Sequence, residues 1–153
     1  MKYLIPIIIL GILSGTFIVY KNFFWKSEYR KGMVAIGDNS FRVDIADDPL
    51  KRALGLSGRD ALGPDEGMIF TFGSSLTRVF WMQDMRIPID ILWINGSQVV
   101  GMEKGALPEP GVPSARLKRY HSPAPVQSVL EIAAGRASEL GIQTGDKVSV
   151  RFE

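Results

Sequence analysis

The alternation of hydrophobic and polar positions predicts a chain built mainly of short β-strands from residue 33 onward. Apolar or alternating runs occur at residues 33–36, 41–46, 67–72, 78–82, 98–103, 126–132 and 148–152. Residues 89–95 are apolar on both faces, which predicts a central strand covered on both sides. The pair Asn95-Gly96 follows this strand and is a strong hairpin signal. About eight short strands in a domain of this size are typical of a β-sandwich or barrel.

Two short helices are expected to interrupt the strands. The first begins with Asp48 as N-cap and Pro49 as the first helical residue, and it ends at Gly55 or Gly58. The second covers residues 135–140. The fold class is therefore mainly β with two short helices.

Residues 104–125 show no clear period and contain five of the nine prolines. A connection of this length is usually functional, extended over the surface, or disordered. It contains Tyr120 and His121, which we include among candidate binding residues, although a partly exposed loop histidine is the simpler interpretation of His121.

The N-terminal segment differs from the rest because residues 3–20 are 18 residues without a charge. A helix of that length spans roughly 27 Å, close to the hydrocarbon thickness of a bilayer. We expect residues 1–21 to be an uncleaved membrane anchor, with a cleaved export signal as the alternative. Residues 22–32 are then a juxtamembrane linker, and residues 33–153 form the folded domain.

Charge is divided unevenly along the chain. Residues 1–31 contain five basic side chains and one acidic one, whereas residues 32–153 contain 13 basic and 15 acidic ones. The slightly acidic body lacks the basic cluster that phosphate binding requires, so we expect no nucleic-acid partner. The basic residues after the apolar run favour a cytoplasmic body, whereas the short N-terminal tail before it resembles an export signal.

The chain contains no cysteine, which excludes disulfides, thiolate metal sites and a cysteine nucleophile. The single histidine makes a histidine-rich metal centre improbable, and no G-x-S-x-G motif is present. We therefore expect no metal and no cofactor.

Asp90 is the most informative polar position because it interrupts an apolar strand. A buried carboxylate must be paired, hydrogen-bonded or protonated. Arg59, Arg78 and Arg86 are its candidate partners, and a structural ion pair between helix end and sheet is the simplest interpretation.

The run Phe80-Trp81-Met82 forms either plain core or the apolar wall of a pocket. An outward Trp81 beside Gln83 and Asp84 would suit a sugar or a peptide, through stacking and hydrogen bonds.

A catalytic alternative uses carboxylates. Asp84, Asp90 and Glu131 would supply general acid–base chemistry for glycoside hydrolysis if two of them lay about 5–10 Å apart in an open cleft. Their separation in sequence does not predict their separation in space.

Four ordered motifs resemble those of a known family. Residues 52–59 (RALGLSGR) resemble its G-L-M-x-R helix end, and residues 67–70 (GMIF) resemble its G-M-L-F strand. Residues 80–91 (FWMQDMRIPIDI) resemble its hallmark F-W-M-K-N-T-x-I-P-L-D-I, and residues 129–135 (VLEIAAG) with Gly145-Asp146 resemble its closing V-L-E-L-x-x-G and G-D. The chain thus resembles the domain of unknown function 192 family over residues 33–153.

The resemblance implies a compact, jelly-roll-like β domain behind an export signal or a single anchor, with no established activity. It also favours an extracytoplasmic body, against the charge count. One departure is that Asp84-Met85 stands where the family commonly has Asn-Thr.

Together these observations predict a single-pass protein of the cytoplasmic membrane with an extracytoplasmic domain. Its function would be that of a non-catalytic binding or scaffolding module of the cell envelope, with a glycan, a peptide or an envelope protein as ligand. The alternative is the envelope glycan hydrolase described above.

Overall fold

The computed structural model describes residues 29–153. The predicted membrane segment, residues 3–20, lies outside this range, and so does most of the predicted linker. Among the described residues, no helix is both long enough and apolar enough to cross a membrane.

The described chain consists of nine strands, two short α-helices and one 3₁₀ turn. The strands are β1 (Arg30–Ile36), β2 (Asn39–Ala46), β3 (Glu66–Leu76), β4 (Val79–Phe80), β5 (Ile89–Asn95), β6 (Gln98–Ala106), β7 (Tyr120–His121), β8 (Val126–Ala133) and β9 (Val148–Phe152). The helices are α2 (Pro49–Leu54) and α3 (Arg136–Glu139), and the 3₁₀ turn is η1 (Ser114–Arg116). The prediction of a mainly β fold with two short helices is confirmed.

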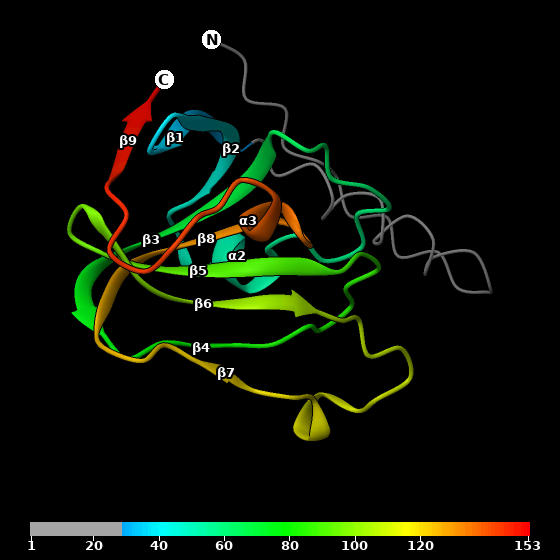
Figure 1. The fold of residues 1–153 in the computed structure, drawn as a ribbon. Helices are drawn as coiled ribbons and strands as arrows, with labels where there is room; N and C mark the ends of the chain where they lie inside the picture. Colours follow the sequence, from blue (N-terminus) through cyan, green and yellow to red (C-terminus); the bar gives the residue numbers. More distant parts are fainter. Residues whose placement is uncertain (1–28) are drawn as a thin grey trace, which may run out of the picture.

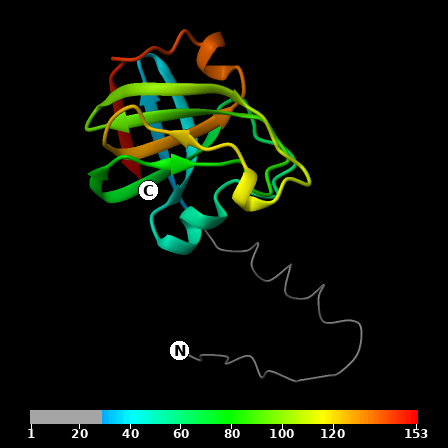
Figure 2. The same ribbon diagram turned by 90° about the horizontal axis from the view of Figure 1, so that it is seen from below.

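Seven strands form one sheet in the order β6-β5-β8-β3-β2-β1-β9 (Figure 1). Only β2 and β3 run parallel, and helix α2 lies in the connection between them. The remaining two strands, β4 and β7, form a separate antiparallel ribbon. Figure 2 shows the last strand, β9, beside β1, with which it pairs.

The expected jelly-roll-like sandwich or barrel is not formed. The large sheet is open, because its edge strands β6 and β9 do not pair; near one end, an isolated bridge joins Gln98 of β6 to Lys147, the residue before β9. The second sheet has two strands of two residues each, too short to act as the opposing layer of a sandwich.

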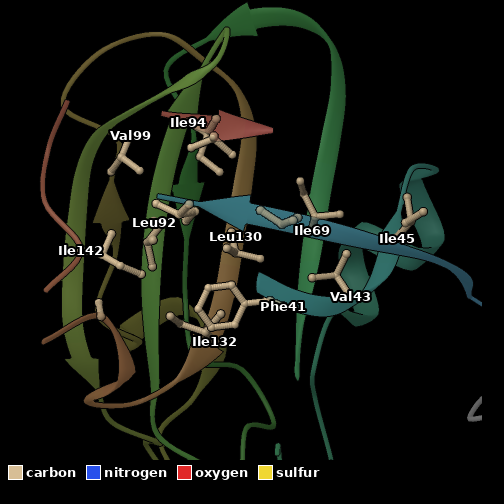
Figure 3. Close-up of a cluster of buried hydrophobic side chains, with 14 residues drawn as sticks. Phe41, Val43, Ile45, Ile69, Leu92, Ile94, Val99, Leu130, Ile132 and Ile142 are labelled. Atoms are coloured by element: carbon tan, nitrogen blue, oxygen red, sulfur yellow. The ribbon is translucent and has the colours of Figure 1, made fainter. Parts of the chain in front are cut away.

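Side chains from the two faces of the large sheet form two hydrophobic clusters. Strand β8 contributes to both, because successive residues point to opposite faces: Leu130 and Ile132 to one, Val129 and Glu131 to the other. Figure 3 shows the first cluster, in which Leu130 and Ile132 lie near Phe41 and Leu92. The second face carries the candidate site.

Several local predictions hold. The Asp48 side chain accepts a hydrogen bond from the Lys51 N–H at 2.8 Å and caps α2, as expected. Strand β5 pairs with β6 and β8 and contributes side chains to both hydrophobic clusters, which explains its unbroken burial before Asn95.

Other local predictions need correction. The first strand begins at Arg30, inside the predicted linker, because its outer half pairs with β2. The strand predicted at 78–82 shortens to Val79–Phe80, since only these two residues find a partner, in β7. The predicted long loop at 104–125 contains the end of β6, η1 and β7, so it is partly ordered by pairing.

Candidate functional site

A cavity of about 390 Å³ lies where helix α2, strand β3 and the segment around β4 meet. Its volume falls in the range of small-molecule sites. Its wall is mainly apolar and aromatic, with three ionisable side chains. The lining residues used below are Arg52, Phe70, Phe72, Arg78, Phe80 and Glu131.

Glu131 is the buried carboxyl group of the cavity. It lies on β8 between Met68 of β3 and Ile91 of β5, and only 5% of it is exposed. Burial disfavours the ionised form and raises the pKa of Glu131 from 4.5 to about 8, although the positive charge of Arg59 opposes the rise. At neutral pH this side chain is therefore mostly a neutral acid that can donate a hydrogen bond.

Arg59 belongs to an ion-pair network next to Glu131. Its guanidinium binds the carboxylate of Asp44, which also binds the Lys31 ammonium. Asp44 is in register with Met68, and Met68 is in register with Glu131, so the two acids lie on the same face of the sheet, two strands apart. The network holds the Arg59 charge near Glu131 while leaving the Glu131 carboxyl without full compensation.

Two further arginines contact one aromatic ring of the cavity. The guanidinium carbons of Arg52 and Arg78 lie 5.3 and 3.9 Å from the centroid of the Phe72 ring. Burial and the nearby charge of Arg52 lower the pKa of Arg78. Two like charges at one ring favour a negatively charged neighbour.

The rest of the wall is aromatic. Phe80 packs edge-on against Phe70 and Trp93, with ring centroids 4.9 and 5.6 Å apart. Trp81 also lines the cavity and is 44% exposed, which is the orientation that a binding role would need. One face of Trp81 is already covered by Arg119, whose guanidinium carbon lies 4.5 Å from the ring centroid.

The predicted arginine partner of Asp90 is wrong. Asp90 is fully buried and accepts two main-chain hydrogen bonds, from Gly105 N at 2.8 Å and from Ala137 N at 2.9 Å. The first donor belongs to a bulge in β6 and the second to helix α3, so Asp90 joins sheet and helix. A carboxylate that accepts two N–H groups needs no cation.

The three predicted arginines have other partners. Arg59 binds Asp44, Arg86 binds Asp60 at 2.7 Å, and Arg78 donates to the Ser74 carbonyl oxygen at 2.7 Å.

The three carboxylates of the hydrolase hypothesis do not converge. Asp90 is in register with Ile132, the neighbour of Glu131, and therefore points to the opposite face of the sheet. Asp84 is exposed and adopts a positive φ of 54° in the turn after Met82. Of the three acids, only Glu131 lines the cavity.

The remaining predicted site residues divide between cavity, core and ribbon. Gln83 lines the cavity, and its carbonyl oxygen accepts a hydrogen bond from the Ser57 hydroxyl at 2.9 Å. Met82 is buried in the second hydrophobic cluster. Tyr120 is buried in β7, whereas His121 is exposed there. Within residues 29–153, no group of three or more histidine or acidic side chains is arranged to hold a metal ion.

Sequence reasoning missed Arg52, Phe70 and Phe72. Phe70 and Phe72 alternate along β3 and therefore share a face, which is a readable signal. Arg52 sits inside a family-like motif, but nothing in the sequence shows that it lies against Phe72.

These features define a small mainly-β domain with an aromatic-lined cavity that contains a buried acid. The family model of the domain of unknown function 192, described as "Uncharacterized ACR", matches residues 32–150, and the chain belongs to this family. The resemblance seen in the motifs is thereby confirmed.

Two solved structures are similar to this one. A proposed transcription regulator from Sinorhizobium meliloti has a TM-score of 0.74 and 29% identity, over 82% of this chain and 97% of its own. A protein of unknown function from Novosphingobium aromaticivorans has a TM-score of 0.68 and 32% identity, over 78% of this chain and 83% of its own. No curated protein matches the chain.

Proposed function

We propose that this protein is a non-catalytic binding module of the cell envelope that receives a ligand in the cavity beside Glu131. The observation that carries the proposal is the composition of the cavity wall, in which aromatic side chains surround a single carboxyl group. Aromatic walls with a few polar groups are typical of binding sites. Glycoside hydrolysis commonly needs two carboxyl groups, so the cavity favours binding over the glycan hydrolase considered above.

The proposal places the domain outside the cytoplasmic membrane, with residues 3–20 as its single-span anchor. The length of the uncharged run supports the anchor. A reporter fused after Glu153 that is active only outside the cytoplasm tests the orientation. Activity outside is expected, and activity of a cytoplasm-specific reporter at the same position would overturn the localisation.

A nucleic-acid ligand is not part of this proposal, although one structural relative is a proposed transcription regulator. Residues 32–153 contain more acidic than basic side chains, which disfavours a phosphate backbone as partner.

The binding role is tested by a thermal-shift screen of the full-length protein in detergent, with envelope glycan fragments and short peptides as probes. A ligand that binds only the folded state raises the melting temperature. The Trp81→Ala variant is expected to lose the response. Phe152→Ala is the matched control, because Phe152 is also an exposed aromatic residue but lies on β9, outside the cavity wall. Chemical turnover of a bound probe would refute the non-catalytic assignment.

A further inference from the structure

The cavity has a charge pattern that selects one class of ligand. Its ionisable lining residues are Arg52, Arg78 and Glu131. Both arginines remain cationic at neutral pH, whereas burial keeps Glu131 mostly neutral. Positive charge therefore exceeds negative charge along the wall.

The hydrogen bonds of the two arginines leave this charge uncompensated. Arg52 donates to the Thr71 carbonyl oxygen at 2.9 Å, and Arg78 donates to the Ser74 carbonyl oxygen at 2.7 Å. Within the described part of the chain, neither arginine has a carboxylate within salt-bridge distance. The buried Nε of Arg78 also has no hydrogen-bond partner there. A buried donor without an acceptor is costly, and guanidinium groups bind carboxylate and phosphate oxygens well.

The surroundings of the arginines specify the rest of the ligand. Both guanidiniums lie against the Phe72 ring, and Phe70 and Phe80 continue the aromatic wall. Apolar side chains from helix α2 and the turn after it, Leu54 and Leu56, line the same cavity. An apolar group is thus accommodated next to the cationic pair.

We propose that the cavity binds a small amphiphilic anion, with its carboxylate or phosphate at Arg52 and Arg78 and its apolar body along the phenylalanine wall. This inference rests on the proposed binding function and specifies its ligand class. The neutral carboxyl of Glu131 serves as a hydrogen-bond donor to a polar atom of the body. The cavity volume of about 390 Å³ limits the ligand to a small molecule or to the terminal residue of a longer one.

The test compares probes of nearly equal shape on the full-length protein in detergent by titration calorimetry. The anionic probe is 4-phenylbutyrate, its neutral counterpart is 4-phenylbutyramide, and an alkyl phosphate forms the third arm. We expect both anions to bind at least about tenfold more tightly than the amide, because a charge-assisted hydrogen bond is lost with the charge. The ratio between carboxylate and phosphate identifies the preferred head group.

Variants locate the head group. Arg52→Gln is expected to weaken 4-phenylbutyrate binding about tenfold and to leave amide binding unchanged. Arg86→Gln is the matched control, because Arg86 is an exposed arginine outside the cavity wall. Arg78→Gln should act like Arg52→Gln, and its melting curve shows whether the loss of the Phe72 contact unfolds the domain. If it unfolds, Arg52→Gln and the probe comparison still decide the question.

Two results would overturn this inference. Equal affinity for acid and amide would show that the arginines do not select charge, while the binding function itself would stand. Failure of all three probes would exclude this ligand class, and the glycan and peptide screen would then decide separately whether the cavity binds anything.

Discussion

Replacing Glu131 with glutamine should change how the stability of the domain depends on pH. The pKa of Glu131 is about 8 in the folded protein, above its ordinary value of 4.5. At pH values between these two, the folded protein keeps the Glu131 proton, whereas the unfolded chain releases it. The contribution of Glu131 to the free energy of unfolding therefore falls as pH rises from about 4.5 to about 8, and this loss is complete above pH 8. Glutamine is neutral throughout and removes the effect.

The magnitude follows from the size of the shift. One pKa unit corresponds to about 1.4 kcal/mol, so the full difference between pH 4.5 and pH 9 is about 5 kcal/mol. The free energy of unfolding of Glu131→Gln minus that of the wild type should therefore increase by about 3–5 kcal/mol as the pH is raised from 5 to 9. Urea unfolding of both proteins, followed by tryptophan fluorescence at pH 5, 7 and 9, measures this gain.

The control for this experiment is Glu103→Gln. Glu103 lies on β6 in register with Ile91, which is also in register with Glu131, but Glu103 is partly exposed. Its replacement should leave the pH dependence nearly unchanged. A stability difference between wild type and Glu131→Gln that stays constant from pH 5 to pH 9 would refute the assignment of a buried, neutral carboxyl group.

Two stability predictions concern packing and buried hydrogen bonds. Asp90→Asn should cost about 2–4 kcal/mol, because an amide supplies one acceptor oxygen where two N–H groups donate, whereas Asp84→Asn at an exposed turn should be nearly neutral. Equal melting temperatures for the two variants would contradict the role of Asp90 as a link between sheet and helix. Gly67→Ala should cost about 1–3 kcal/mol, because its Cβ would lie 2.6 Å from the Glu131 carbonyl oxygen. Gly73→Ala, with nothing within 4 Å of its Cβ, is the control, and similar urea midpoints for the two alanine variants would argue against this close approach.

The strands were predictable because each has a clear local pattern. Residues 89–95 are apolar at every position except Asp90 and the final Asn95, and such a run indicates a strand with both faces covered, as β5 is. Strand β4 was predicted, although as a longer strand, but β7 and its pairing with β4 were not predictable, since two-residue strands are specified by pairing between distant segments rather than by alternation.

The burial of Asp90 was predictable, but its partners were not. An acid within an apolar strand signals burial, whereas backbone N–H groups from Gly105 and Ala137 have no sequence signature, because every residue except proline carries one. In the candidate site, too, residue types were readable from the sequence whereas contacts were not. Trp81 and Glu131 stood out by residue type, while Arg52 became visible only when the fold placed it against Phe72.

The pairing of β1 with β9 has a consequence for biosynthesis. Gly32 is in register with Phe152, so the first strand of the domain needs a neighbour that is synthesised last. Until that strand emerges, β1 exposes an unpaired edge, and the nascent chain cannot complete the sheet. Such long-range contacts slow folding. The domain should therefore acquire its native structure only after translation has passed Phe152, which makes its folding a late, post-translational event.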